Sequence, residues 1–560
     1  MSKTRAPITI DATLPEKTAG IGHGAYEGAD RGSRELASWR PRATSADALI
    51  NDGRAKVTMD SRARDLLRND GQVAGAATLQ KDSIVGSQYR LNSQPAQGVL
   101  ERMFPGLGFT EDWAEQFQRE TEELFTLYAE SIDSWIDVQR TWSFTGMIRM
   151  AVGCYFAGGE ALLTCNWMRG AGRPFATAFQ LVDCDRLSNP NGVADDRFLR
   201  NGVVLDRNAA PTSVWIRDAH PGDMLRGQDL HSWTNRPIYK SWGRHHTILL
   251  RNLQRPEQTR GVADMVTVLK ETRMAAQFHE TTLANAIANA SFAATIESEL
   301  PPEMAARMIG AENAGKDIMD PAVAMLSAIS EYTRGGQSIQ LGGVKIPTLF
   351  PGTKLKMLPA GTVGGVGDAF EASLLRKIAA GLGVSYEELT RDFSKTNYSS
   401  FRAAANQTQR SVTARKREVA DYVANAIYRN WLEEAIDLRM IPSLEPMLAK
   451  VPDLFYRPLV RDALAAATWI GASRGQVDEM KETQAAVMRI KSGLSTYEIE
   501  TARLGVDFRE VFRQRAREKR LAESYGLDFA LDVKKPGTVT GIEAQTNNQQ
   551  EANNADADDE

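Results

Sequence analysis

VADMVTVLKETRMAAQFHETTLANAIANASFAATIESEL, residues 262–300, is the stretch that decides the fold of this chain. It contains neither Gly nor Pro, and Pro301-Pro302 ends it. It predicts a helix that, at roughly 1.5 Å per residue, is on the order of 55 Å long if unbroken, which exceeds the usual length in globular proteins. Its first half carries an apolar face and its second half is more polar, so we expect its surroundings to change along its length.

A second long helix is expected further along the chain. It begins near Asp368, a residue type that caps helix N-termini, and carries a broad apolar face. Between the two helices, residues 301–360 contain a helical start and then SIQLGGVKIP at 338–347, whose central Gly-Gly predicts a tight hairpin turn. The two helices therefore bracket a small α/β insert.

Beyond the second helix, residues 386–441 contain no Gly or Pro. Within them, DFSKTNYSS at 392–400 is poor in helix-forming residues and predicts a loop. A long helix is expected to resume at Phe401 and to end before Pro442. Three further helices are predicted at 484–491, 496–503 and 508–523, the last rich in arginine.

The N-terminal half combines helices with a lobe of strands. A helical pattern between 36 and 77 is interrupted by Asn69-Asp70-Gly71, and an apolar stripe predicts one helix over 112–143 that packs in the core. From 161 to 250, short β-prone runs alternate with Asn-Pro, Asn-Gly and Pro-Gly turns. The fold class is therefore α+β and predominantly helical.

Composition limits the function classes. A chain of 560 residues with 42% hydrophobic residues folds for most of its length, whereas the polar residues 1–30 and 536–560 predict a disordered N-terminal arm and a disordered acidic tail. A net charge of -4 argues against a protein that grips DNA tightly, but it is compatible with one that lets DNA pass.

The cysteine count and the hydropathy pattern indicate a cytoplasmic assembly site. The three cysteines, Cys154, Cys165 and Cys184, fit no zinc or redox spacing and predict reduced thiols. No export signal is visible, and no apolar stretch reaches the length that a membrane helix requires.

No motif demands a catalytic site, a metal or a cofactor. Residues 310–317, GAENAGKD, resemble a phosphate-binding loop, but Asp317 replaces the hydroxyl residue that reaches magnesium, and no strand precedes the motif. The Gly-rich stretch 361–367 is interpreted as a flexible joint. His245-His246 and His279-Glu280 lack partners at metal-ligand spacing. The arginines of 508–523 could contact DNA or pair with acids of this chain or its neighbours.

Five ordered blocks give the chain a resemblance to the lambda-type family of phage portal proteins. They span nearly the whole chain except its two ends, and they are SRARDLLRN (61–69), RPEQTRGV (255–262), LRKIAAGLGV (375–384), DFSKTNYSS (392–400), and GLSTYE (493–498) followed by GVD (505–507).

The resemblance implies a ring, usually of twelve subunits, at one capsid vertex, through which double-stranded DNA is packaged and ejected. It implies a portal fold with a wing (31–260, helical and then β-rich), a first stem helix (261–300), a clip (301–360), a second stem helix (361–390), a tunnel loop (391–399), a long wing helix (400–450) and a crown (451–535).

By this resemblance, the tunnel loop is the candidate DNA-channel site. We interpret it as a loose collar of phosphate and neutral contacts that resists DNA backsliding. Phe393 stands where the family usually has tyrosine, and Phe401 where a small residue is usual. The site residues are Arg391, Asp392, Ser394, Lys395, Thr396, Asn397, Tyr398 and Ser399.

The implied partners are other copies of the chain, the terminase large subunit that supplies ATP hydrolysis, the major capsid protein, a head-tail connector or adaptor, and passing DNA that is not read by sequence. No cofactor and no membrane are expected, and the protein belongs in the virion after assembly in the host bacterial cytoplasm. Two alternatives stay open. One is a minor capsid or scaffolding protein without a channel, and the other is a nucleotide hydrolase that uses residues 310–317.

Overall fold

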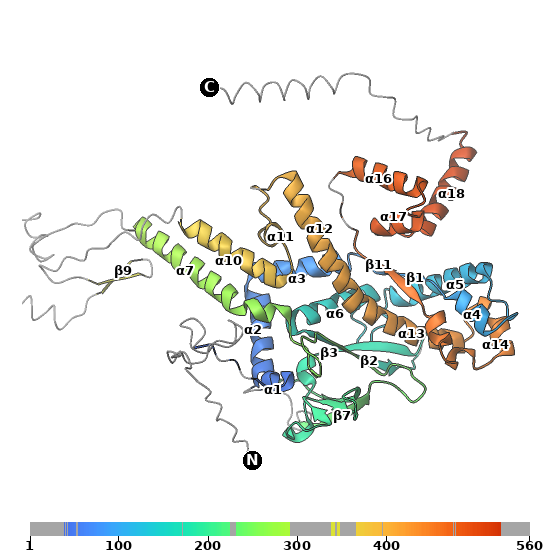
Figure 1. Ribbon diagram of the computed structural model, residues 1–560, viewed down its shortest axis with the longest axis horizontal. Helices are drawn as coiled ribbons and strands as arrows, with labels where there is room; N and C mark the ends of the chain where they lie inside the picture. Colours follow the sequence, from blue (N-terminus) through green and yellow to red (C-terminus); the bar gives the residue numbers. More distant parts are fainter. Residues whose placement is uncertain are drawn as a thin grey trace, which may run out of the picture.

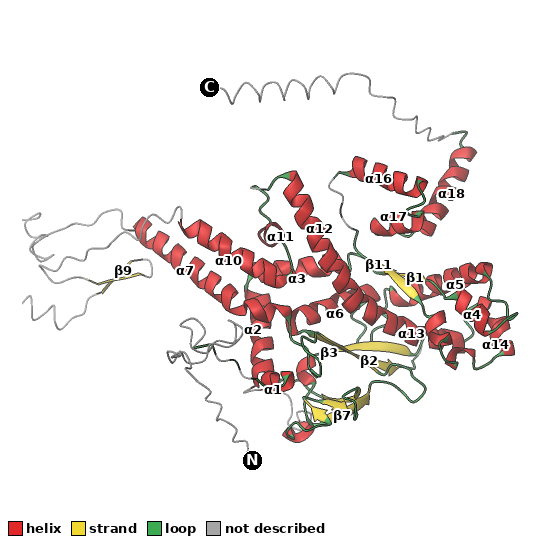
Figure 2. Cartoon of the chain, viewed as in Figure 1, coloured by secondary structure: helices red, strands yellow, loops and turns green. Residues whose placement is uncertain are grey.

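The computed structural model shows a mixed body of helices and sheets from which one helical pair projects (Figure 1, Figure 2). It describes residues 38–39, 41, 43–51, 54–170, 172–223, 231–291, 338–341, 344–347, 366–394, 396–473, 475 and 478–527. The predicted N-terminal arm, acidic tail and Gly-rich residues 361–365 lie outside these ranges, as does all of the predicted clip except one hairpin.

The N-terminal helices are α1 (Ala46–Asn51), α2 (Ala55–Asn69) and α3 (Gly71–Ile84). Asp70 separates the last two as predicted, because its side chain accepts hydrogen bonds from the Gln72 and Val73 amides and so caps α3. After the short strand β1 (Arg90–Ser93) come α4 (Gln97–Met103), α5 (Glu111–Ala129) and α6 (Phe144–Gly158).

The single helix predicted over 112–143 is wrong in its second half. Helix α5 begins after Thr110, whose side chain caps it, and ends at Ala129. Beyond it, the backbone of Ile136 and Val138 pairs with Phe179 in the neighbouring sheet, while the Asp137 carboxylate accepts hydrogen bonds from three amides of the following turn. The apolar stripe extends beyond Ala129. The backbone there forms hydrogen bonds with a strand and with the Asp137 carboxylate, and these replace the hydrogen bonds of a helix.

The sheet-rich lobe is confirmed as two antiparallel sheets. The first, in the order β3-β2-β8, contains β2 (Glu160–Trp167), β3 (Thr177–Val182) and β8 (Thr247–Arg251). The second, in the order β4-β5-β6-β7, contains β4 (Leu199–Arg200), β5 (Val203–Leu205), β6 (Pro211–Arg217) and β7 (Trp233–Pro237). A cluster of buried residues that includes Leu162, Val182, Val203 and Val214 joins the two sheets.

The main core lies where α5, α6 and α13 (Tyr422–Asp437) meet the first sheet. Its centre is aromatic, with Phe125 packed edge-on against both Tyr428 and Trp431. Such pairs add roughly 0.5–1.5 kcal/mol to the free energy gained by burial alone. This core packs α13 against the first sheet.

The projecting pair consists of α7 (Leu269–Ser291) and α10 (Val366–Leu382). A short 3-10 turn, Asp264–Val268, precedes α7, and residues 292–300 lie outside the described part. The predicted first helix is therefore confirmed over 269–291. The predicted hairpin is confirmed by the antiparallel strands β9 (Ser338–Leu341) and β10 (Val344–Pro347).

After α10 come α11 (Tyr386–Thr390), the loop at 391–397 and α12 (Tyr398–Arg415). One π-helical turn, Lys416–Asp421, joins α12 to α13, so the predicted long helix is confirmed with a local widening. It begins at Tyr398 rather than at Phe401, because Asn397 caps it, so the last three residues of the predicted loop 392–400 are helical. The chain continues through α14 (Glu445–Lys450), α15 (Val460–Leu464) and β11 (Ala467–Ile470), which pairs with β1.

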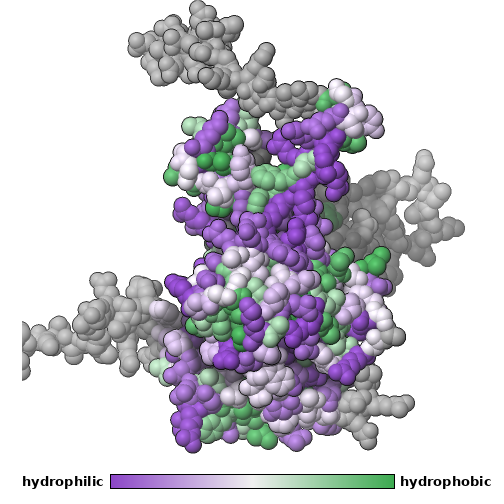
Figure 3. All heavy atoms as spheres, turned by 90° about the vertical axis from the view of Figure 1, so that its right-hand side faces the viewer, coloured by the Kyte–Doolittle hydropathy of each residue, from purple (hydrophilic) through white to green (hydrophobic). Residues whose placement is uncertain are grey.

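The three predicted C-terminal helices are confirmed as α16 (Glu479–Lys491), α17 (Tyr497–Arg503) and α18 (Phe508–Ser524). They contact the body through polar groups: Glu498 accepts from Asn92 and Gln94, and Arg513 pairs with Glu123. Figure 3 shows hydrophobic side chains among hydrophilic ones on this upper part of the molecule. Exposed apolar residues there include Met488, Leu494 and Tyr525.

Candidate functional site

The predicted tunnel loop connects α11 to α12, and both helix ends are fixed. Ser385 and Glu388 form a capping box at the start of α11. Arg391 ends this helix in the left-handed region, at φ 55°. At the other end of the loop, the Asn397 side chain accepts a hydrogen bond of 2.8 Å from the Ser400 amide and caps α12. The loop is thus a short span between two capped helices.

Two of the candidate DNA contacts hold the loop itself. The Asp392 carboxylate accepts a hydrogen bond of 3.0 Å from the Ser394 amide, and Asn397 caps α12 as described. Arg391 and Ser394 are exposed, and Thr396 is half-buried. Tyr398 and Ser399 form the first residues of α12, and Lys395 lies outside the described residues.

Phe393 and Phe401, which depart from the usual pattern of the resembled family, contact each other. Their rings lie 5.3 Å apart, centroid to centroid, at 84°, which is an edge-to-face arrangement. Phe393 is 47% exposed, so nearly half of its surface stays in contact with water despite this contact. The aromatic ring at 401 therefore packs against the aromatic ring at 393 across the loop.

Helix α12 is tied to the base of the projecting pair. Thr408 donates a hydrogen bond of 2.9 Å to Glu388 of the capping box. At its far end, Arg415 forms an ion pair with Asp264, which belongs to the turn that precedes α7. A displacement of α7 would therefore act directly on the helix that follows the loop.

The projecting helices pack antiparallel. Lys377 pairs with Glu271 near the body, at 2.6 Å, while the Phe278 and Phe370 rings meet further out, with centroids 5.4 Å apart. Sequence position rises along α7 as it falls along α10, which gives the antiparallel direction. His279 lies 3.9 Å from Glu371 in this pair.

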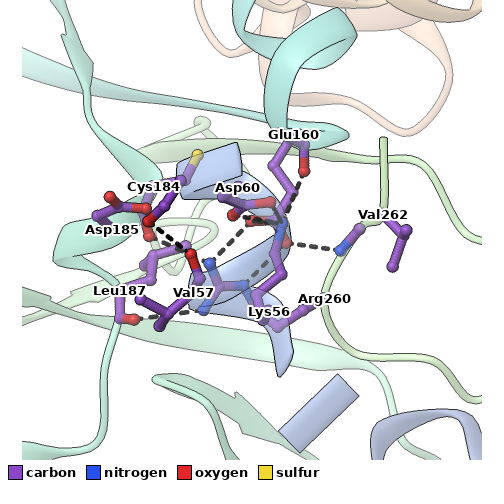
Figure 4. A network of polar contacts seen from close by, with 12 residues as sticks. Lys56, Val57, Asp60, Glu160, Cys184, Asp185, Leu187, Arg260 and Val262 are labelled. Atoms are coloured by element: carbon purple, nitrogen blue, oxygen red, sulfur yellow. Dashed lines mark hydrogen bonds and ion pairs between the residues drawn. The ribbon is translucent and has the colours of Figure 1, made fainter. Parts of the chain in front are cut away.

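A buried charge network joins the segment that precedes the projecting pair to β2 and α2 (Figure 4). The Glu160 carboxylate at the start of β2 accepts two hydrogen bonds of 2.8 Å from Arg260 and one of 2.6 Å from the Gly261 amide. Lys56 of α2 lies 3.7 Å from Glu160 and 2.9 Å from Asp60. Three segments far apart in the sequence thus meet at one point.

The charges in this network follow from its burial. Burial tends to raise the pKa of Glu160, but the charges of Arg260 and Lys56 hold it below its ordinary value. Burial raises the pKa of Asp60 to about 6, against the opposing effect of Lys56. Arg260 belongs to one of the five resembling blocks, but the sequence did not reveal its partner, which lies 100 positions earlier.

Gly261 is required at this point by close packing. A Cβ atom built there would lie 2.1 Å from the Gly159 carbonyl oxygen and 2.9 Å from the Asn252 amide nitrogen. Such contacts are far shorter than side chains tolerate, so the Arg-Gly pair combines a buried charge with a close backbone approach.

The other candidate residues have structural environments. Burial lowers the pKa of His245 to about 4, and its ring packs on Tyr239. The three cysteines are free thiols, as predicted. Asp183, Asp185 and His220 converge, but Arg64 forms ion pairs with both aspartates and supplies the positive charge there. The motif at 310–317 lies outside the described residues.

The arginine-rich helix α18 uses part of its charge within the subunit. Arg513 pairs with Glu123 at 3.0 Å, and Glu510 pairs with Arg90. Within the part of the chain that is described, no helix is both long and apolar enough to cross a membrane.

Comparisons with known proteins identify the family. Residues 32–416 match the family described as phage portal protein, lambda family. The chain is 36% identical over 515 residues to the portal protein of Escherichia phage N15, covering 91% of this chain and 93% of that one. It is also 36% identical over 507 residues to portal protein B of Escherichia phage lambda, covering 90% and 91% of the two chains.

Solved structures share lower similarity. A chain from the neck of an empty GTA particle, computed with C6 symmetry, is 12% identical, with a TM-score of 0.38 and coverage of 79% of this chain and 93% of that one. A chain from the neck of a native GTA particle, computed with C12 symmetry, is 14% identical, with a TM-score of 0.29 and coverage of 77% and 99%. The family assignment rests on the sequence matches: this chain belongs to the lambda family of phage portal proteins.

Proposed function

We propose that copies of this chain close into a ring of twelve subunits at one capsid vertex, around a channel that double-stranded DNA crosses during packaging and ejection. The observation that carries the ring is the projecting α7–α10 pair, which leaves large apolar side chains in water. Met274, Leu283 and Phe370 are 47%, 55% and 52% exposed. Neighbouring copies that cover these side chains would remove the cost of their exposure.

In this ring, residues 31–260 form the wing and α7 and α10 the stem. Residues 301–360 form the clip, 400–450 the long wing helix and 451–535 the crown. The antiparallel stem pair and the charge network at its base support this division, because they give the stem a rigid attachment to the wing.

The loop at 391–397, together with Tyr398 and Ser399 at the start of α12, is proposed to form the collar around DNA. Arg391 and Ser394 are exposed and can contact phosphates, and Lys395, Thr396, Tyr398 and Ser399 complete the candidate set. Asp392 and Asn397 are proposed to position the loop rather than to bind DNA, since both side chains already accept backbone hydrogen bonds.

Alanine at both Lys395 and Tyr398 tests the collar. We expect rings that still form but particles that retain less packaged DNA, because cationic and aromatic contacts to the duplex are lost. The matched control is Lys491→Ala with Tyr497→Ala on the exposed surface of the C-terminal helices. Unchanged packaging, retention and ejection in the loop variant would remove the collar from the proposal.

The remaining roles are those of a passive channel. We propose no catalysis and no cofactor: the terminase large subunit docks on the clip and supplies ATP hydrolysis, and a connector or adaptor protein replaces it. The major capsid protein surrounds the ring in the virion, and assembly takes place in the host bacterial cytoplasm.

Negative-stain images of the purified protein test the ring directly. Closed rings with a central hole are the expected result. Monomers without a hole, at every concentration and in disrupted virions, would contradict the proposal and favour a minor capsid or scaffolding role.

A further inference from the structure

The segment that follows the loop is basic and free of acids. Between Phe393 and Arg417 there is no Asp or Glu, although acids make up 71 of the 560 residues and the whole chain carries a net charge of -4. The six basic residues in this segment are Lys395, Arg402, Arg410, Arg415, Lys416 and Arg417. Such a concentration of one sign creates a local positive field that the overall charge does not reveal.

Helix geometry divides these charges between two faces of α12. Thr408 and Val412 lie on the inner face, which packs toward α11 and the core. Arg402 and Arg410 of α12 and Arg417 of the π-helical turn that continues it are exposed, and their spacings of eight and seven residues place them on the opposite face. From the first to the last, this stripe is about 22 Å long at 1.5 Å per residue.

The inner and outer charges differ in their partners. Arg415 pairs with Asp264 and Lys416 with Asp421, so both are neutralised within the subunit. In contrast, Arg410 and Arg417 have no ion-pair or hydrogen-bond partner among the residues that the structure describes.

The remaining charged groups at this face are few. Arg402 lies near Asp478 and contributes, after Lys481, to lowering the pKa of that carboxyl. Glu418 lies at the edge of the face, where it accepts a hydrogen bond of 3.4 Å from Tyr155. The middle of the stripe is therefore positively charged without a counterion from the described chain.

The side chains that line the surface between Arg410 and Arg417 are small and uncharged. A shallow groove runs along it, lined by Gln409, Arg410, Thr413, Ala414, Arg417 and Glu418. No large exposed apolar side chain occurs between Phe401 and Glu418. A protein interface normally places aromatic or aliphatic residues at its centre, which this face lacks. A polyanionic backbone is bound by exposed guanidinium groups, and small neighbouring side chains leave these groups accessible.

We propose that the outward face of α12 and of the π-helical turn that continues it, with Arg402, Arg410 and Arg417, is a binding surface for the phosphate backbone of double-stranded DNA. It reads no sequence, because it presents charge and amides at a flat surface rather than side chains that enter a groove. The inference rests on the proposed function and extends it. The DNA contact is a continuous path from the loop onto the helix, and its strongest charges lie on the helix.

Charge reversal at Arg410 and Arg417 tests the surface. Full-length protein carrying Arg410→Glu and Arg417→Glu is titrated with a fluorescent 40-base-pair duplex of arbitrary sequence, between about 50 and 200 mM salt. We expect affinity at the lowest salt to fall by at least about tenfold. We also expect a shallower dependence of log K on log salt, since each lost phosphate contact removes about 0.9 from the slope.

Two further variants make the result specific. Arg169→Glu with Arg207→Glu reverses two exposed charges in the sheet-rich lobe and should leave both affinity and slope unchanged. Arg517→Glu on α18 tests the competing arginine-rich helix. If Arg517→Glu weakens binding and the α12 variant does not, the DNA surface is on α18 and the proposal is wrong.

Assembly is measured in parallel by mass photometry. Rings that form normally with unchanged DNA affinity in the α12 variant overturn the inference and leave the ring intact. Rings lost on charge reversal but kept with Arg410→Lys and Arg417→Lys also overturn it, because the face then lies between copies. If wild-type protein itself forms no ring, the proposed function fails, while the comparison of DNA affinities still decides the role of α12.

Discussion

Glu160 and Glu122 are two carboxylates that the sequence did not single out, and both lie inside the molecule. They differ in what surrounds them. Glu160 faces the positive charges of Arg260 and Lys56, whereas Glu122 accepts hydrogen bonds from the uncharged Gln118 side chain and the Ser93 amide. At the scale of single residues, the same chemical group therefore has opposite pKa shifts.

Replacing Glu160 with glutamine should destabilise the subunit strongly. Arg260 would keep its charge in a buried site without its partner, which costs on the order of 3–5 kcal/mol. The surface pair Asp82–Arg149 provides the control, since Asp82→Asn should cost no more than about 1 kcal/mol. Urea unfolding followed by circular dichroism measures both variants. Equal losses would mean that the buried network does not fix the base of the α7–α10 pair.

Glu122 predicts a pH dependence. Burial raises its folded-state pKa to about 7, above its unfolded value, so the folded state binds the proton more tightly. Stability from this group is therefore present below the unfolded pKa and falls as pH rises toward 7, by up to about 1.4 kcal/mol per pH unit. Glu122→Gln should flatten the decline, while Glu115→Gln on the exposed face of the same helix should not. Parallel pH profiles for wild type and Glu122→Gln would contradict the assignment.

At the scale of elements, capping explains why the loop at 391–397 is short and defined. Helix α11 ends at Arg391 and α12 begins after Asn397, and the Phe393–Phe401 contact bridges the two sides. The sequence predicted the loop from its poor helix formers, and the structure shows that its polar residues also serve as caps. A side chain that caps a helix is less available to a ligand, which divides the candidate site into positioning and contacting residues.

Asn397→Ala should loosen the first turn of α12. Loss of an N-cap costs roughly 1 kcal/mol, and the Ser400 amide would lose its hydrogen-bond partner. Hydrogen exchange of the peptide that covers the start of α12 should become several-fold faster. Asn406→Ala, an exposed position within the same helix, is the control and should leave exchange in that turn unchanged. Unaltered exchange in the Asn397 variant would show that other contacts hold the loop.

At the scale of the whole molecule, the projecting α7–α10 pair has large apolar side chains that a single subunit leaves exposed. It is joined to the body by a buried network at one end and presents apolar side chains to water along its length. The α12 ion pair to Asp264 connects the loop to the same base. A ring of subunits would therefore fix stem, loop and wing together.

Leu283→Glu should prevent ring closure without unfolding the subunit. Leu283 is 55% exposed, so a charge there is harmless in the free chain but is buried when a neighbour covers it. Mass photometry should find mainly single subunits with a normal circular dichroism spectrum. Gln277→Glu introduces the same charge at an exposed polar position of α7 and should still form rings. Normal rings with Leu283→Glu would exclude this face from the subunit contact.

The sequence by itself determined the type and order of most elements. Runs without Gly or Pro became α7, α12 and α13, turn-rich β-prone runs became the two sheets, and Asp70 and Thr496 capped the helices that follow them. These features depend on backbone preferences within a few residues, which local patterns encode. The five ordered blocks also indicated the family that the comparisons confirm.

Only the tertiary structure decided where α5 ends, which charges are buried and which residues of the loop are occupied. Helix α5 stops because the chain near Val138 pairs with Phe179, and Glu160 is charged because Arg260 reaches it from another segment. The contact between the Phe393 and Phe401 rings is likewise seen only in the folded chain. Such pairings depend on distances between segments that are remote in the chain, and neither periodicity nor composition encodes those distances.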